Sequence, residues 1–405
     1  MGAEGTHDEA PATLTAQPLP TTPSRLAVGS GSDPDPDPYS PEVASARPES
    51  LPPKSRAEAA RHAKLVRKMK KQAAAAEAKS RKAATRREDK LVSSKAAWME
   101  LIHGNGLGAG ASKKQRKKVA ELLRLGVPSS ARPRVWAAAL GNPLSITPDL
   151  FDILRSKASE AHSLARAARQ SGAADGETSL APREHSLLGI YLDLPRTYPE
   201  LSIFDEGGPM HDQLRDVLGA FVCYRPDMGY VQGMSFPAAL LLLNLPLYDA
   251  FVAFCTLLNM PLLAAFFRLE TDELSRWMDE FNALAHEVLP DLAIHLDAVG
   301  LQPNLYLVPW VMTLFARALP LDLAAHAWDY LFIHGQVFIF HMALGILLYL
   351  RDQLLAEDFE GAMLLLSGRL PHDTSDADLF AAVRSIKLSP RLWLVLRRVS
   401  TCSTV

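Results

Sequence analysis

Apolar side chains in the second half of the chain repeat with the period of an α-helix. In residues 211–224 they recur at intervals of three and four, and Pro226 follows. A second segment has a helix start at Pro320 and a terminator at Gly335. No sustained alternation of period two, bounded by hairpin turns, occurs in residues 91–405. The pattern therefore predicts an all-α fold.

Two longer apolar runs, residues 236–267 and 337–350, predict helices buried in a core. The first is interrupted by Asn, Pro and Asp, and the second stops near 14 residues, short of the roughly 18 needed to span a bilayer. Residues 170–185 are rich in Gly, Ser, Ala and Glu and separate two helical patterns. They predict a surface insertion.

The N-terminal part of the chain departs from this pattern. Residues 1–53 are rich in Pro, Ser and acids and carry a net charge of −6, which predicts a disordered acidic tail. Residues 54–92 are rich in Ala, Lys and Arg without an apolar stripe, and the net charge of 54–90 is +10. This segment predicts a basic, solvated helical arm. Either it binds an acidic partner or it is a solubilising linker, with the linker favoured.

Composition narrows the class of protein. The chain is 48% apolar and 22% charged with a net charge of −2, which argues against a nucleic-acid binder that is basic throughout. Three cysteines make no disulfide framework, and none has zinc-ligand spacing. The N-terminus lacks the pattern of an export signal. A cytoplasmic location is expected, and a Met-Gly start that fits a loose myristoylation pattern leaves acylation open.

Simple catalytic signatures are absent. No P-loop motif occurs, so the chain is not expected to hydrolyse nucleotides by itself. Gly233 and Ser235 resemble the start of a nucleophile elbow, but Pro237 replaces its second glycine and no strand precedes it. The histidines are scattered, and His326, His334 and His341 fall on apolar helices, so no metal site is predicted.

Two short polar segments stand between apolar helices. In the first, Pro195 and Pro199 stiffen the chain around Arg196, which should lie on a loop just after a helix end. In the second, Pro226 and Gly229 mark a turn before Gln232, and Gly233 allows a ligand to approach the backbone. A fixed cation beside a neutral amide suits the orientation of a water against a phosphate. A structural ion pair and a loop hydrogen bond explain the same residues, so the pattern alone leaves both open.

These segments resemble the TBC domain of Rab GTPase-activating proteins. Its two best-known signatures, I-x-x-D-x-x-R and Y-x-Q-G, occur as Ile190-x-x-Asp193-x-x-Arg196 and Tyr230-x-Gln232-Gly233. An earlier signature, Arg four residues before Trp, matches Arg132 and Trp136. A later one matches Leu319-Pro320-Leu321-Asp322, Trp328-Asp329 and Gly335. The resemblance covers roughly residues 95–395, so we expect a TBC domain at 93–395 and a C-terminal tail at 396–405.

The resemblance implies an all-helical domain that binds a GTP-loaded Rab GTPase. Arg196 would act as an arginine finger that neutralises charge on the phosphates, and Gln232 as a glutamine finger that aligns the attacking water. Asp193 would orient Arg196. Structural roles are expected for the outer signature residues, which are Arg132, Trp136, Trp328 and Asp329. Departures are mild, such as Tyr198 where the family often has Phe.

GTP and Mg²⁺ would belong to the partner GTPase, and the chain needs no cofactor of its own. The main alternative is a non-catalytic scaffold or effector that holds a Rab without accelerating hydrolysis, against which both fingers argue. A third possibility, a nucleic-acid or lipid binder led by residues 54–90, leaves the polar segments without a purpose. We therefore expect a cytoplasmic protein, peripheral on endomembranes if 54–90 contacts anionic lipid, and no specific nucleic acid.

Overall fold

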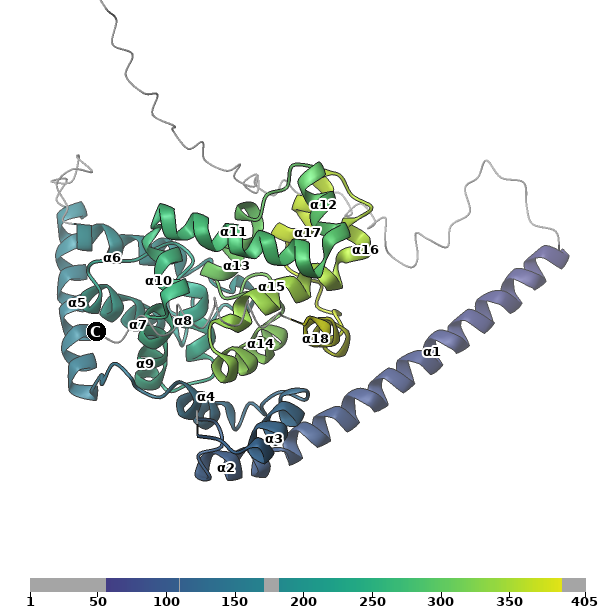
Figure 1. Ribbon diagram of the computed structural model, residues 1–405, viewed down its shortest axis with the longest axis horizontal. Coiled ribbons are helices and arrows are strands. Elements are labelled where there is room, and N and C mark those ends of the chain that lie inside the picture. Colours follow the sequence, from purple (N-terminus) through teal and green to yellow (C-terminus); the bar gives the residue numbers. More distant parts are fainter. Residues whose placement is uncertain (1–55, 109, 171–181, 388–405) are drawn as a thin grey trace, which may run out of the picture. The chain divides into compact units, whose positions relative to one another are not determined.

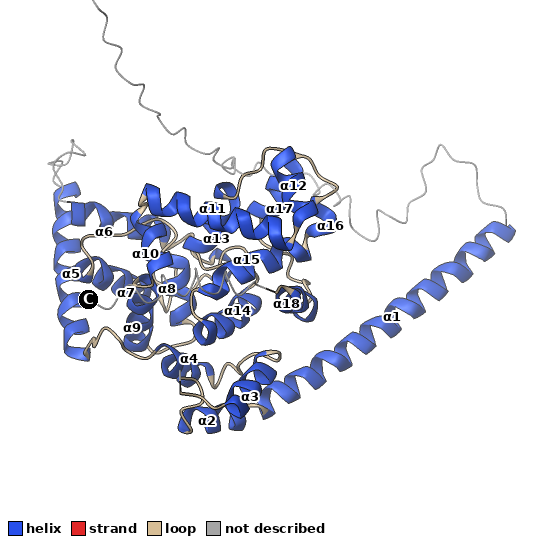
Figure 2. Ribbon diagram, in the orientation of Figure 1, coloured by secondary structure: helices blue, strands red, loops and turns tan. Residues whose placement is uncertain are grey.

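A computed structural model describes residues 56–108, 110–170 and 182–387 of the chain. All regular structure within them is helical, and no β-strand occurs there (Figure 2). The predicted all-α fold is therefore confirmed. The predicted acidic tail, residues 1–53, and the predicted C-terminal tail, 396–405, lie outside the described residues.

The helices are labelled in Figure 1. The first six are α1 (Arg56–Ser93), α2 (Lys95–His103), α3 (Lys113–Leu123), α4 (Arg132–Leu140), α5 (Pro148–Gln170) and α6 (Pro182–Asp193). A short 3₁₀ helix, η2 (Pro199–Leu201), precedes α7 (His211–Tyr224), α8 (Ser235–Leu242), α9 (Leu247–Leu258), α10 (Pro261–Arg268), α11 (Thr271–Val288) and α12 (Pro290–Ala298). The last six are α13 (Asn304–Met312), α14 (Leu321–His334), α15 (Val337–Tyr349), α16 (Arg351–Leu354), α17 (Phe359–Ser367) and α18 (Asp376–Ser385).

The chain divides into two units after Glu77. In the first unit, α1 is described from Arg56, and its described side chains are exposed apart from Val66, which is half-buried. This is the helix expected for the basic arm. The second unit holds the rest of α1 and all the other helices.

The core of the second unit consists of helices that the apolar pattern predicts. Helix α7 spans the predicted residues 211–224 and buries its apolar stripe. The run 236–267 forms α8, α9 and α10, and the run 337–350 forms α15, whose side chains are mostly buried. Each large apolar side chain buried in this way stabilises the fold by about 1.5–3 kcal/mol. Figure 1 shows α8 and α15 in the middle of the helices of this unit.

One boundary differs from the prediction. The expected insertion at 170–185 is partly helical, because α5 extends to Gln170 and α6 begins at Pro182. Proline suits the first turn of a helix, where its missing N–H would have no partner. The Gly, Ser, Ala and Glu content of this segment gave no signal for the start of α6 at Pro182. Residues 171–181 lie outside the described residues.

Among the described residues, no single helix is long and apolar enough to cross a membrane. Helices α9 and α10 reach the required length only together, and they are bent by 83° at the break between them.

Candidate functional site

The first polar segment follows directly after α6. The helix ends at Asp193, Pro195 comes two residues later, and Arg196 leaves the turn with 52% of its side chain exposed. The neighbouring side chains of Leu194 and Thr197 are buried. Arg196 is thus an exposed cation, and the residues on either side of it in the loop are anchored in the core.

The second polar segment joins α7 to α8. It runs from residue 225 to 234, and Gln232 is exposed on it. Gly233 has a backbone angle φ of +102°, a conformation that residues other than glycine rarely adopt. The backbone therefore changes direction at the residue after Gln232, and the N–H of Gly233 points toward Asp193 in the first segment.

Asp193 joins the two segments. Its carboxylate accepts hydrogen bonds from the Arg196 guanidinium, from the Tyr230 hydroxyl at 2.5 Å and from the Gly233 N–H at 3.4 Å. Only 3% of Asp193 is exposed. One buried carboxylate therefore holds Arg196 and the residue after Gln232 beside each other.

Burial and the Asp193 carboxylate together keep the Tyr230 hydroxyl protonated. Burial raises the pKa of Tyr230 far above its ordinary value, and the charge of Asp193 raises it further. The hydroxyl of Tyr230 consequently stays protonated at neutral pH. It acts as a permanent donor to Asp193 from a position two residues before Gln232.

A second connection lies beneath the first. The hydroxyls of Thr197 and Ser235 are 2.7 Å apart, and both residues are buried. Tyr198, at φ +49°, is also buried, and its hydroxyl donates to the Ala316 carbonyl at 3.1 Å. The tyrosine that departs from the family pattern therefore anchors the Arg196 loop by a bond that Phe cannot make.

Sequence reasoning did not find the ion pairs that brace the second segment. Arg225 binds Asp227 through two nitrogens, at 2.9 and 2.8 Å, and Arg268 reaches the same carboxylate at 3.2 Å. The Arg225 guanidinium holds the pKa of Asp227 well below its usual range. The short spacing of Arg225 and Asp227 was a local signal, whereas Arg268 comes from the end of α10 and was not foreseeable from spacing.

The outer signature residues form a separate buried cluster around Asp329. Its carboxylate accepts from Trp136 Nε1 at 2.8 Å, from the Val127 N–H at 2.8 Å, and from Arg132 at 3.2 and 3.4 Å. The preceding residue, Gly126, has φ +89°, which other residues rarely adopt, and a Cβ there would lie 3.2 Å from the His326 ring. Trp328 instead donates to the Leu314 carbonyl at 2.8 Å. The structure thus places these four residues in the core rather than beside Arg196.

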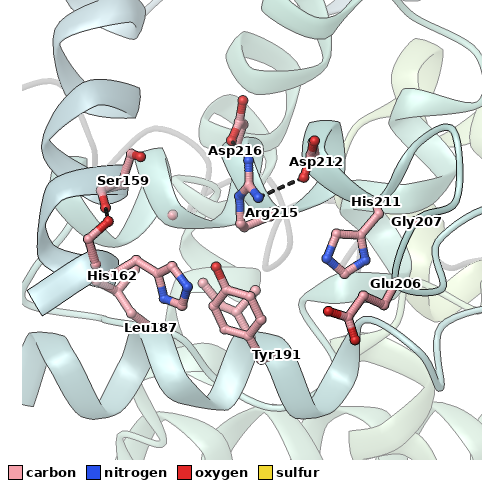
Figure 3. A pocket seen from close by; sticks show the side chains of 14 residues that line it. Ser159, His162, Leu187, Tyr191, Glu206, Gly207, His211, Asp212, Arg215 and Asp216 are labelled. Atoms are coloured by element: carbon pink, nitrogen blue, oxygen red, sulfur yellow. Dashed lines mark hydrogen bonds and ion pairs between the residues drawn. The ribbon is translucent and has the colours of Figure 1, made fainter. Parts of the chain in front are cut away.

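A cavity of about 420 Å³ lies on another side of α6, between α5, α6 and α7 (Figure 3). Arg215 in its wall is paired with Asp212 at 2.6 Å and with Asp216 at 3.1 Å. Tyr191 stacks on His162 with ring centres 4.0 Å apart. Neither Arg196 nor Gln232 lines this cavity. In the part of the chain that the structure describes, no group of His, Cys, Asp and Glu is arranged to hold a metal ion.

Comparison with known proteins identifies the family. Residues 129–355 match the Rab-GTPase-TBC domain (RabGAP-TBC). The chain is 41% identical over 350 residues to TBC1 domain family member 12 of Xenopus tropicalis, and 39% identical over 353 residues to TBC1 domain family member 14 of Homo sapiens. It therefore belongs to the TBC-domain family of Rab GTPase-activating proteins, as the sequence signatures predict.

The alignments cover most of this chain but only half of each of these two relatives. The two alignments span 84% and 85% of this chain but 50% of each relative, so the chain spans about half the length of these curated relatives. Drainin of Dictyostelium discoideum is 32% identical over 391 residues, which cover 87% of this chain and 89% of that protein.

Solved structures support the same fold. The RabGAP TBC domain from the Chlamydomonas flagellum superposes with a TM-score of 0.54 and 21% identity, covering 74% of this chain and 96% of that one. The Ypt/Rab-GAP domain of Gyp1p gives a TM-score of 0.52 at 14% identity, covering 70% of this chain and 92% of that one.

Proposed function

We propose that this chain accelerates GTP hydrolysis by a Rab GTPase, supplying Arg196 and Gln232 in trans. The observation that carries the proposal is the position of Asp193, whose carboxylate binds Arg196 and the N–H next to Gln232. A guanidinium and an amide from separate loops are thereby held together at the surface. This is the pair of groups that phosphoryl transfer needs, because its loose transition state requires positioned charge and an oriented water.

Each finger has a distinct role. Arg196 neutralises charge that develops on the phosphate oxygens, and its exposed side chain swings from Asp193 toward them when the Rab binds. Gln232 aligns the attacking water by accepting one of its hydrogens and donating to a phosphate oxygen. GTP and Mg²⁺ come with the partner, and Tyr230 keeps Asp193 in place.

The test is a multiple-turnover assay of phosphate release, with the full chain and a panel of GTP-loaded Rab GTPases. Acceleration of at least one Rab is expected. Saturable binding to a GTP-loaded Rab with no acceleration across the panel would instead identify the non-catalytic scaffold.

Replacement of Gln232 by Ala distinguishes the role of Gln232 from that of Arg196. We expect the catalytic rate to fall strongly while the Kd for the Rab in a transition-state mimic rises only moderately, because Arg196 still contacts the phosphates. The measurements are single-turnover hydrolysis and titration binding, with thermal unfolding as the control for folding. A variant that loses stability and Rab binding together would show that Gln232 is a structural loop residue.

We also propose that the basic arm attaches the protein to anionic membranes. The support is the charge of residues 54–90, which is +10, and the exposure of the described Lys and Arg side chains in the first unit. Basic residues near an anionic lipid surface each contribute about 1 kcal/mol of attraction at low salt. The protein would then be cytoplasmic and peripheral on endomembranes, where Rab substrates are anchored.

Neutralising four exposed basic residues of the arm should remove most binding to anionic vesicles. The substitutions to Gln are at Lys64, Arg67, Lys68 and Lys71. The matched control carries the same change in charge on α3, at the exposed positions Lys113, Lys114, Arg116 and Lys117. Co-sedimentation is measured at low and at physiological salt. Equal pelleting of the two variants, or pelleting that salt does not weaken, would contradict the role of the arm.

A further inference from the structure

A second cavity in the TBC domain has an apolar interior and a basic rim. It measures about 320 Å³ and lies between α3, α14, α15 and α18. Figure 1 shows α14, α15 and α18 as neighbouring helices. Leu123, Phe338 and Val383 line the cavity and are at most 4% exposed. Arg124 and Arg384 line it as well, and both are exposed, so its positive charge lies on the solvent side.

The two arginines have no acidic partner. Neither Arg124 nor Arg384 forms an ion pair within the part of the chain that the structure describes. His334 and His341 also line the cavity but add no charge at neutral pH, because partial removal from water lowers the pKa of both rings. The cavity therefore offers two cations to an anion from outside the domain.

A buried hydroxyl in the same cavity has no hydrogen bond. Tyr330 is 6% exposed, and its oxygen meets no partner among the described residues in hydrogen-bond geometry. Burial raises the pKa of Tyr330, so the hydroxyl keeps its hydrogen, while Arg384 lies close enough to lower that pKa. Asp376 raises it too, but this carboxylate already binds Arg87 and His326. An unpartnered buried donor is unfavourable, and an acceptor that entered the cavity would relieve it.

Aromatic rings in the wall lie close to parallel. Tyr330 and Phe338 stack with ring centres 5.2 Å apart and an interplanar angle of 14°, and His334 is inclined by 29° to both. Such rings present a flat surface on which a further ring can stack. An apolar cavity of about 150 Å³ holds one benzene ring, so about 320 Å³ has room for a body of two rings.

We propose that this cavity binds a small aromatic carboxylate, with its rings against Tyr330 and Phe338 and its carboxylate between Arg124 and Arg384. The Tyr330 hydroxyl donates a hydrogen bond to a carboxylate oxygen. The ligand thus supplies the anion that both arginines lack and the acceptor that the hydroxyl lacks. Arg124 directly follows α3 and Arg384 lies in the last turn of α18. Binding therefore connects these two helices and stabilises the folded domain.

Calorimetric titration of the full chain with three compounds tests the site. The first, 2-naphthoate, carries two fused rings and a carboxylate. The second, 2-naphthamide, has the same shape without the charge, and decanoate has the same charge on a flexible acyl chain. We expect one-to-one binding of 2-naphthoate and a higher thermal unfolding midpoint in its presence. The other two compounds should bind about tenfold more weakly or worse, because each lacks one recognised feature.

Substitutions that line the cavity should weaken the binding of 2-naphthoate. Arg124→Gln and Arg384→Gln should each raise its Kd severalfold, and the double variant should raise it further. Tyr330→Phe should raise the Kd about tenfold, yet leave the unfolding midpoint of the free protein unchanged or higher, because the lost hydroxyl had no partner. The matched control is Arg116→Gln, at an exposed arginine of α3 that does not line the cavity. It should bind 2-naphthoate as the unmodified chain does.

Three results would overturn the proposal. The first is the absence of saturable binding of 2-naphthoate. The second is equal or tighter binding of 2-naphthamide or decanoate, because the charge or the rings would then not be recognised. The third is unchanged affinity in the Arg124→Gln and Arg384→Gln double variant and in Tyr330→Phe, with normal folding by circular dichroism, which would place the ligand elsewhere. None of these readouts depends on GTPase activation, so the test is independent of the proposed function.

Discussion

Replacement of Arg196 by Ala is expected to abolish nearly all acceleration of GTP hydrolysis, with little loss of stability. An arginine finger contributes about 10³- to 10⁵-fold in rate, or roughly 4–7 kcal/mol of activation free energy. Half of the Arg196 side chain is exposed, with a fraction of 52%, so its removal leaves no cavity in the core. The measurement is single-turnover hydrolysis by the Rab that the panel identifies, with the thermal unfolding midpoint of each variant recorded alongside.

Two variants sharpen this test. Arg196→Lys should lose most of the activity as well, because an ammonium lacks the planar fork that contacts two phosphate oxygens. Arg276→Ala is the matched control, since Arg276 is an arginine of α11 with 68% of its side chain exposed and it contacts neither polar segment; it should retain full activity. Full acceleration by a folded Arg196→Ala protein would falsify the assignment of the finger.

The elements around this site were predictable because their signals are local. Residues 211–224 carry the helical stripe within themselves, and Pro226 ends the pattern where α7 ends. Pro195 and Gly233 likewise marked the loops on which Arg196 and Gln232 lie. Proline and glycine restrict or extend backbone conformation at their own position, so sequence alone reveals them.

Contacts between distant segments were not predictable from spacing. Tyr230 meets Asp193 across 37 residues, and Asp329 meets Val127 across 202. Periodicity places each residue on a helix or a loop, but only the packing of the helices decides which loops meet. The roles of Arg196 and Gln232 came from the resemblance to a family, since residue types and spacing alone had favoured a structural ion pair and a loop hydrogen bond.

The two buried aspartates show how similar chemistry serves different purposes. Asp193 binds groups on two surface loops, one of them the exposed Arg196, so under the proposed function its ion pair would open when a partner offers phosphate oxygens. Asp329 is completely surrounded, and its side chain has an exposed fraction of 0%. Burial raises the pKa of Asp329, which means that its charge is costly there and is maintained by its donors.

Replacement of Asp329 by Ala should therefore destabilise the fold by about 3–5 kcal/mol, the usual cost of leaving a buried charge without its partner. Arg132, the Val127 N–H and the Trp136 indole would all lose their acceptor. Asp329→Asn should also be strongly destabilising, because an amide has one acceptor oxygen and would turn its NH₂ toward a donor. Chemical unfolding measures both effects.

The matched control for this prediction lies on the same helix. Asp322 is exposed in the first turn of α14, near the positive end of the helix dipole, so Asp322→Ala should cost less than about 1 kcal/mol. The fraction of Asp329→Asn protein that remains folded at low temperature should keep the catalytic rate of the unmodified chain, since Asp329 touches neither finger loop. A normal unfolding curve with a lowered catalytic rate would instead link this cluster to the chemistry and contradict its purely structural role.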